Sequence, residues 1–236
     1  MSVVNSDSVR AGASGVIAGY TIDNSCVFDG AADYLTFTPS TPTDNNTWTF
    51  SCWLKIANHA SDNILNLLDS TSSDSVQHYV RIQSQTVRMI QYDSGYEMRL
   101  RSAAYLRDAA AWYHIVFVMD TSNGTSGDRT RMYINGVRQT VFITESQPSL
   151  NETSFINTAS RGMAIGRNAY ASGAEIGYMN GYLAEVVFID GLALTASSFG
   201  ETDDNGVWVP VDPSTLTFGT NGFWLDFANS SALGND

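Results

Sequence analysis

The segment from residue 47 to residue 56 constrains the fold most, because apolar side chains occupy every second position in it. A period of two is the repeat of a β-strand, in which successive side chains point to opposite faces of a sheet. One face of this strand is therefore predicted to lie in a core, and Trp53 is the large apolar residue on the opposite face. The residues predicted to point inward are Trp48, Phe50, Cys52, Leu54 and Ile56.

Strand-like segments and turns fill the rest of the chain. Residues 112–119 are apolar on both faces, which predicts a central strand that is covered on both sides. Asn135 and Gly136 predict a tight hairpin, because both residues tolerate a positive φ. Thr195 is predicted to cap a short helical turn. Together these features predict an all-β fold, a two-sheet antiparallel jelly-roll sandwich with at most one short helical turn. Further strands are predicted at residues 26–30, 34–37, 78–83, 87–89, 96–101, 182–189 and 223–227.

Composition and charge exclude several classes of function. The chain has 236 residues, of which 43% are hydrophobic, so it can bury a core of its own. Its formal net charge is −12, and no basic residue follows Arg167. General nucleic-acid binding and docking on anionic lipid both need a cationic surface, so we expect neither partner. No apolar run approaches the roughly 18 residues of a membrane-spanning helix.

Three parts are expected along the chain. Residues 1–19 are small and polar, which predicts a flexible N-terminal arm that is either disordered or held by a neighbouring subunit. Residues 20–200 form the predicted sandwich, and residues 201–236 form an acidic C-terminal extension with one further strand that could lead to another module. The first residues do not resemble a signal peptide. Cys26 and Cys52 lie in apolar segments and are expected to be buried thiols, with a single bridge as the alternative.

Four segments occur in a characteristic order, at residues 28–35, 48–55, 112–136 and 165–186. Together they resemble the laminin-G-like, concanavalin A-like jelly-roll family over roughly residues 20–200. The resemblance implies the sandwich predicted above and, as in many such domains, a calcium ion at one edge. Asp29 and Asp120 end predicted strands and are generic candidates for its ligands. The alternative is that each aspartate closes a turn through its own backbone.

Four other segments carry a narrower resemblance, at residues 20–25, 188–195, 199–208 and 220–227. They are similar to virion proteins of tailed bacteriophages, especially marine ones, where such domains occur in tail fibres and other appendages. The resemblance implies a viral structural protein made in the host cytoplasm and located on the surface of the phage particle. Its implied partners are other virion proteins, further copies of itself and glycans of the host surface.

An aromatic and cationic surface is the main candidate binding site. Six side chains predicted to face outward would gather there if their strands are neighbours. Sugars stack on aromatic faces, and arginine forms bidentate bonds with carboxylates or sulfates. The alternatives are a contact with another subunit and a plain surface on which Glu97 pairs with the arginines. The six residues are Trp53, Tyr79, Arg81, Arg88, Arg99 and Arg101.

A second candidate is a calcium loop in the acidic C-terminal part. Its oxygen-bearing residues follow the spacing of an EF-hand loop, and a glycine allows the sharp turn. The first and last positions depart from that pattern, and prolines prevent a second helix, so the hypothesis is a looser loop. The alternative is a polar turn whose side chains cap backbone groups. The predicted ligands are Glu201, Asp203, Asn205 and Asp212, with Gly206 at the turn.

A glycoside hydrolase of this fold would carry carboxylates in an E-x-D-x-x-E pattern on one strand. Residues 201–206 and 185–190 are the nearest matches, and both fail the spacing. His114 is expected to be structural, since no nucleophile motif lies near it. We therefore predict no catalytic residue and a non-enzymatic structural or adhesion module of a phage particle. A lectin-like carbohydrate-binding domain, with or without calcium, is the first alternative, and a hydrolase is the remote one.

Overall fold

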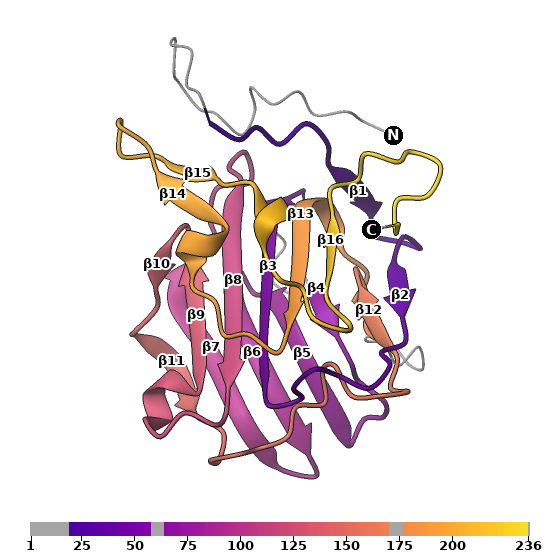
Figure 1. Ribbon diagram of the computed structural model, residues 1–236, viewed down its shortest axis with the longest axis vertical. Coiled ribbons are helices and arrows are strands. Elements are labelled where there is room, and N and C mark those ends of the chain that lie inside the picture. The colour runs from indigo at the N-terminus through magenta and orange to yellow at the C-terminus, as the bar shows by residue number, and fades with distance from the viewer. Residues whose placement is uncertain (1–18, 58–63, 170–176, 236) are drawn as a thin grey trace.

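Two large antiparallel sheets pack face to face in the computed structural model, which describes residues 19–57, 64–169 and 177–235 (Figure 1). The predicted N-terminal arm, residues 1–19, lies outside the described residues except for Gly19. No helix in the described part is long and apolar enough to cross a membrane. The prediction of an all-β, two-sheet antiparallel sandwich is confirmed.

Sheet A is built around the long strand β13. Its order is β1-β13-β3-β8-β9-β10, and β16 also pairs with β13. The bulge at Glu185 divides β13, so that β1 pairs with its first half and β16 with its second half. The strands of sheet A are β1 (Cys26–Asp29), β3 (Thr47–Ile56), β8 (Tyr113–Asp120), β9 (Thr130–Ile134), β10 (Val137–Arg138), β13 (Asn180–Asp190) and β16 (Phe223–Leu225).

Sheet B is a run of hairpins with the order β11-β7-β6-β5-β4-β12-β2. Its three middle strands follow one another in the chain, as the alternating segments predicted. The strands of sheet B are β2 (Leu35–Phe37), β4 (Ile64–Asp69), β5 (Val76–Gln83), β6 (Thr86–Asp93), β7 (Tyr96–Tyr105), β11 (Phe142–Ser146) and β12 (Met163–Ile165). A small third sheet pairs β14 (Gly200–Thr202) with β15 (Trp208–Pro210).

The core lies between sheets A and B. The side chains of β3 that were predicted to point inward are at most 2% exposed, which confirms the alternation. Asn135 and Gly136 have φ values of 47° and 77° and form the predicted hairpin between β9 and β10. The inward residues of β3 are Trp48, Phe50, Cys52, Leu54 and Ile56.

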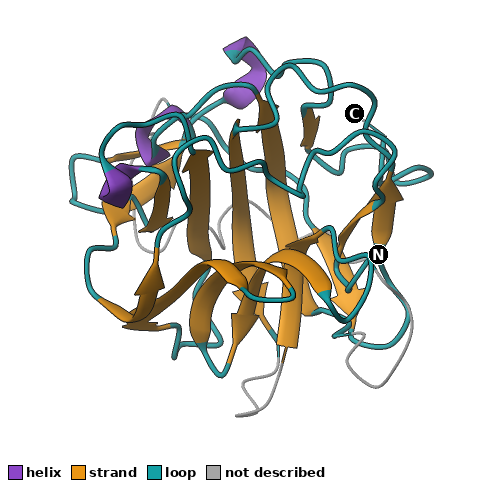
Figure 2. Ribbon diagram, turned by 90° about the horizontal axis from the view of Figure 1, so that it is seen from below, coloured by secondary structure: helices purple, strands orange, loops and turns teal. Residues whose placement is uncertain are grey.

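The outer face of sheet A is also buried, because the C-terminal part of the chain folds back over it. We call residues 193–224 the C-terminal cover. Phe199, Phe218 and Trp224 of this cover pack on Val116 and Val118 of β8. Figure 2 shows these loops and short helical turns on one side of the sandwich. The cover explains why β8 is apolar on both faces, as its sequence predicted.

The C-terminal segment contributes more than the single strand predicted for residues 201–236. It supplies β15 and most of β14, and it adds β16 to sheet A. Three short 3-10 turns occur among the described residues, rather than at most one. The turn after Thr195 is among them, but the Thr195 side chain makes no capping bond. The three turns are η2 (Ser126–Asp128), η3 (Ala196–Ser198) and η4 (Pro213–Thr215).

Candidate functional site

Three arginines stand side by side across the outer face of sheet B. Arg81 of β5 lies directly opposite Arg88 of β6, and Arg88 lies directly opposite Arg101 of β7. Because neighbouring strands lie about 4.8 Å apart, the three residues form a row about 10 Å long across the strands. Arg99 stands two residues from Arg101 on the same strand and face. We call Arg81, Arg88 and Arg101 the arginine row.

Neutral side chains hold the guanidinium groups of the arginine row. Gln83 Oε1 accepts a hydrogen bond from Arg81 at 2.8 Å and another from Arg88 at 2.9 Å. Thr86 Oγ1 accepts from Arg88 Nε at 3.3 Å and from Arg101 Nε at 3.2 Å, and it donates to the Gln83 carbonyl. These bonds orient the guanidinium groups without neutralising their charge.

Tyrosine rings flank the arginine row. The Arg81 guanidinium lies 3.8 Å from the centre of the Tyr79 ring, and the Arg99 guanidinium lies 4.6 Å from that of Tyr96. The Tyr92 and Tyr96 rings meet edge to face at 5.2 Å. Tyr79 is 4% exposed, whereas Tyr96 is 55% exposed. The face therefore offers an exposed aromatic ring beside Arg99, farther along β7 from the arginine row.

The described residues place no carboxylate in an ion pair with the arginine row. The ion pair that they contain joins Arg138 and Asp128, at the edge of sheet A. Glu97 accepts a hydrogen bond from the buried Gln91 instead, so the alternative in which Glu97 pairs with the arginines is wrong. Asp69 of β4 is buried, and burial raises its pKa to about 6.

The electrostatic cost of the arginine row is visible at its middle member. Partial burial and the neighbouring guanidinium groups of Arg101 and Arg81 lower the pKa of Arg88 to about 10. Like charges directly opposite each other in a sheet are destabilising. The chain as a whole carries a net charge of −12, so the arginine row is a cationic patch on an acidic protein.

Trp53 does not belong to this surface, contrary to the sequence-based grouping. It lies on β3 in sheet A and is 4% exposed. Its side chain does point away from the core between the sheets, as predicted, but Ile22 packs against it there. The His114 ring stacks on Trp53 at 4.8 Å and accepts a hydrogen bond from Trp208 Nε1. Burial lowers the pKa of His114 to about 3, in agreement with a structural histidine.

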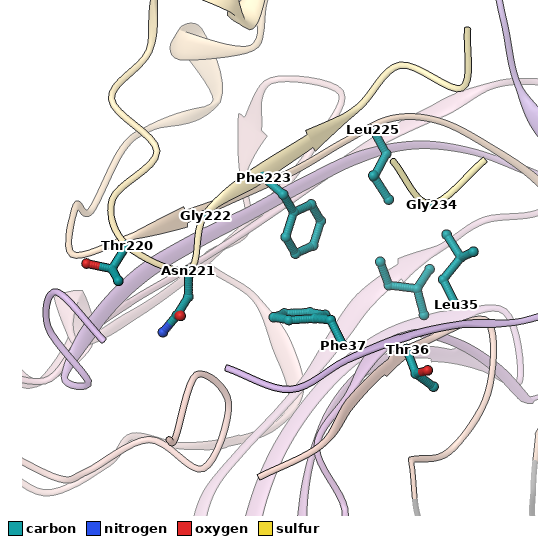
Figure 3. Close-up of a pocket in the computed structure, with 10 residues that line it drawn as sticks. Leu35, Thr36, Phe37, Thr220, Asn221, Gly222, Phe223, Leu225 and Gly234 are labelled. Atoms are coloured by element: carbon teal, nitrogen blue, oxygen red, sulfur yellow. The ribbon is translucent and has the colours of Figure 1, made fainter. Parts of the chain in front are cut away.

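A cleft of about 280 Å³ opens between β2 of sheet B and β16 of sheet A (Figure 3). Phe37 and Phe223 point toward one another across it, with ring centres 5.1 Å apart. The side-chain amide of Asn221 at its rim bonds to Ser40 and to Asn157. The cleft is therefore mainly apolar, and the Asn221 amide at its rim is already engaged within the chain.

The fold and the sequence both match a known family. The laminin G model of the concanavalin A-like lectin/glucanases superfamily matches residues 29–198. The chain belongs to this superfamily. The laminin-G-like resemblance is thus confirmed, whereas the narrower resemblance to phage virion proteins stays a prediction.

Solved structures of two other proteins share the fold. A putative carbohydrate binding protein from Bacteroides ovatus is 16% identical with a TM-score of 0.56, over 86% of this chain and 53% of its own. A native heptameric SAP-like pentraxin from Limulus polyphemus is 18% identical with a TM-score of 0.51, over 72% of this chain and 77% of its own. The chain thus spans about half the length of the Bacteroides protein. A search of curated proteins found no match.

The calcium candidates of this concanavalin A-like domain lie in ordinary turns. Asp203 closes the β14–β15 hairpin by accepting the Asn205 and Val207 backbone N–H groups, and Asp212 caps η4. Asp29 accepts three backbone N–H groups in the turn after β1. Within the described residues, no three His, Cys, Asp or Glu side chains cluster as metal ligands. Calcium binding by Glu201, Asp203, Asn205 and Asp212 stays a prediction.

Glu185 and Asp190, the carboxylates of the match at residues 185–190, both accept hydrogen bonds within the chain. Glu185 is 6% exposed and accepts hydrogen bonds from Tyr20 and from Trp224. Burial raises its pKa to about 7. Asp190 is 1% exposed and accepts from the backbone of Thr43 and from other groups around it. Both carboxylates therefore hold neighbouring segments of the chain against β13 through hydrogen bonds.

Sequence reasoning missed four members of the sheet B surface. Gln83 lies two residues from Arg81 and so shares its face, but its role as an acceptor for two arginines follows from the register of β5 and β6. A period of two would place Tyr96 on the same face as the buried Met98, but a register shift after Gln91 turns its ring to the outside. The alternation of side chains along a strand does not reveal such a shift before the strand partners are known. The four residues are Gln83, Thr86, Tyr92 and Tyr96.

Proposed function

We propose that this chain is a non-enzymatic adhesion module that binds carbohydrate through the outer face of sheet B. The observation that carries the proposal is the difference between the two outer faces. The C-terminal cover buries that of sheet A, whereas that of sheet B presents Tyr96 and the arginine row. Membership of the concanavalin A-like lectin/glucanases superfamily supports a lectin-like role.

The chemistry of this face suits a sugar. Apolar C–H faces of sugar rings stack on aromatic side chains, and Tyr96 is exposed for such a contact. Guanidinium N–H groups donate to hydroxyl, carboxylate or sulfate oxygens in fixed directions. The hydrogen bonds of Gln83 and Thr86 hold Arg88 in place before any ligand arrives, which reduces the entropy lost on binding.

A non-enzymatic role is favoured by the state of the buried carboxylates. Glu185 and Asp190 are engaged in hydrogen bonds inside the protein, and neither lies in the arginine row's sheet. A retaining or inverting glycosidase needs two carboxylates facing the substrate. A calcium ion at the Asp203 turn, assisting sugar binding, is a secondary proposal.

The setting that we propose is the surface of a tailed phage particle. The support is the sequence resemblance of residues 20–25, 188–195, 199–208 and 220–227 to phage virion proteins. In that setting the module would contact other virion proteins, including further copies of itself, and host-surface glycans. Mass spectrometry of purified particles tests this setting, and absence of the chain from particles that infect normally would refute it.

A glycan array with neutral and acidic sugars tests the binding proposal directly. We expect wild-type protein to bind, and Tyr96→Ala to reduce binding at least tenfold without unfolding. Tyr34→Ala is the matched control. Tyr34 is 42% exposed and has an arginine, Arg167, over its ring, but it lies between β1 and β2, away from the arginine row. Arrays run with calcium and with a chelator test the secondary proposal, in which calcium assists sugar binding. Equal loss of binding in both variants, or no binding by the wild type, would contradict the proposal.

A further inference from the structure

The register of sheet B sets three like charges against one another, and the fold itself gives no reason for it. Arg88 faces Arg81 on one side and Arg101 on the other. Opposite charges at such positions stabilise a sheet, and like charges weaken it. The described residues place no carboxylate within ion-pair distance of any of the three. An external group with negative charge would relieve this repulsion.

The arginine row is also held ready for such a group. Gln83 accepts from a terminal nitrogen of Arg81 and of Arg88, Thr86 accepts from Nε of Arg88 and of Arg101, and neither acceptor carries a charge. The hydrogen bonds of Arg101 to described residues use Nε, so its two terminal nitrogens remain for a ligand. A carboxylate in place of Gln83 would satisfy the same donors and lower the positive potential. Because Gln83 and Thr86 are neutral, they orient the arginine row and leave its positive charge in place.

The length of the row indicates the kind of ligand. Three guanidinium groups about 4.8 Å apart, one per strand, span about 10 Å across the sheet. A single small anion reaches one or two of them, whereas a polymer with repeated anionic groups reaches all three. With Arg99 beside the row, the fourth cation continues the patch toward the exposed Tyr96 ring. The remaining surface of a chain with net charge −12 repels polyanions and so confines them to this face.

We infer that the arginine row binds an anionic polysaccharide, whose sulfate or carboxylate groups lie across β5, β6 and β7. This inference rests on the proposed function and narrows its ligand from carbohydrate in general to polyanionic carbohydrate. The polymer runs perpendicular to the strands. Its anionic groups take the remaining N–H groups of Arg88 and Arg101, and a neighbouring part of the polymer reaches Arg99 and Tyr96 farther along β7.

Dextran and dextran sulfate form a matched pair of probes, since they share a backbone and differ in charge. We expect purified full chain to bind dextran sulfate, with affinity that falls as salt rises, and to bind dextran much more weakly. Polygalacturonate tests carboxylate in place of sulfate. Duplex DNA tests whether charge alone suffices, and it should bind much more weakly than the sulfated sugar.

Arg88→Gln is the decisive variant. We expect it to weaken dextran sulfate binding about tenfold and to flatten the salt dependence, because one charge-assisted contact is lost. Arg138→Gln removes the same charge from an exposed ion pair of sheet A and should leave binding unchanged. The melting temperature of Arg88→Gln, measured beside that of the wild type, shows whether the variant is folded at the assay temperature, so that lost binding cannot be ascribed to unfolding.

The outcomes separate this inference from the proposed function. Equal binding of dextran and dextran sulfate, both lost in Tyr96→Ala, would overturn the polyanion inference and leave carbohydrate binding intact. Equal effects of Arg88→Gln and Arg138→Gln would overturn the assignment to the arginine row. Duplex DNA that binds as tightly as dextran sulfate would overturn the sugar specificity. If no glycan binds, the proposed function itself fails.

Discussion

Arg81 and Arg88 face each other across neighbouring strands, and both donate a hydrogen bond to the same oxygen, Gln83 Oε1. A neutral acceptor thus lies where a counter-ion would stabilise the sheet. Charged-group hydrogen bonds contribute about 1.5–3 kcal/mol, and a neutral amide gives up part of the available attraction. The choice of glutamine is a property of the surface that stability alone does not explain.

Gln83→Glu should therefore raise stability and weaken polyanion binding. A carboxylate at this position pairs with Arg81 and Arg88 and cancels part of their charge. We expect the free energy of unfolding to increase by about 1 kcal/mol, measured by urea denaturation. Gln83→Ala serves as the control, and it should lower stability because two donors lose their acceptor. A destabilised Gln83→Glu protein would contradict this account of the arginine row.

Trp53→Ala should destabilise the fold rather than alter a surface. The ring is buried between His114 and Ile22, so its removal leaves a cavity. Truncation of a buried tryptophan to alanine costs about 3–5 kcal/mol. We expect a loss of this size in urea denaturation. A loss below about 1 kcal/mol would show that Trp53 is more open in solution than in the structure.

The raised pKa of Glu185 should make the free energy of unfolding decrease as pH rises. Burial raises the pKa of this carboxyl from its ordinary 4.5 to about 7, so the folded chain holds a proton that the unfolded chain releases. Between these values the unfolded state binds fewer protons, and stability falls with increasing pH by a few kcal/mol at most, on the order of the shift. About one pH unit above this folded pKa, where the carboxyl is ionised in both states, its contribution becomes constant.

Glu185→Gln isolates this effect. The amide keeps the size of the side chain but does not titrate, so the difference in unfolding free energy between wild type and variant should change between pH 5 and pH 7 and level about one pH unit higher. Subtracting the two profiles removes the contribution of Asp69, whose pKa is also raised by burial. A difference that stays constant across this range would contradict the assignment to Glu185.

The two cysteines should be indifferent to redox conditions. Cys26 and Cys52 are free and buried, and burial raises the pKa of both thiols, so neither is prone to react. We expect the melting temperature to be the same with and without a reducing agent. A thiol reagent should titrate both groups only after denaturation. Unfolding by mild reduction alone would contradict the structure.

The sequence predicted the sandwich well because the alternation of β3 depends on local geometry alone. The same alternation indicated which face Trp53 occupies, but not which sheet β3 joins, so Trp53 was grouped with Arg81 across the molecule. Pairing partners depend on contacts far apart in the chain. The outward position of the Tyr96 ring could not be predicted for a related reason. The register shift between β6 and β7 becomes visible only when both strands are aligned.

The division of β13 has a mechanical consequence. Cys26, where β1 begins, is paired with Leu183, and Leu225, where β16 ends, is paired with Val186. The first and the last strand of the chain therefore meet within three positions of one strand, on either side of the Glu185 bulge. A tensile load applied through both ends would pull at this single joint and peel β1 and β16 from sheet A. Sheet B, with its arginine row, contains neither β1 nor β16 and so takes no part in this joint.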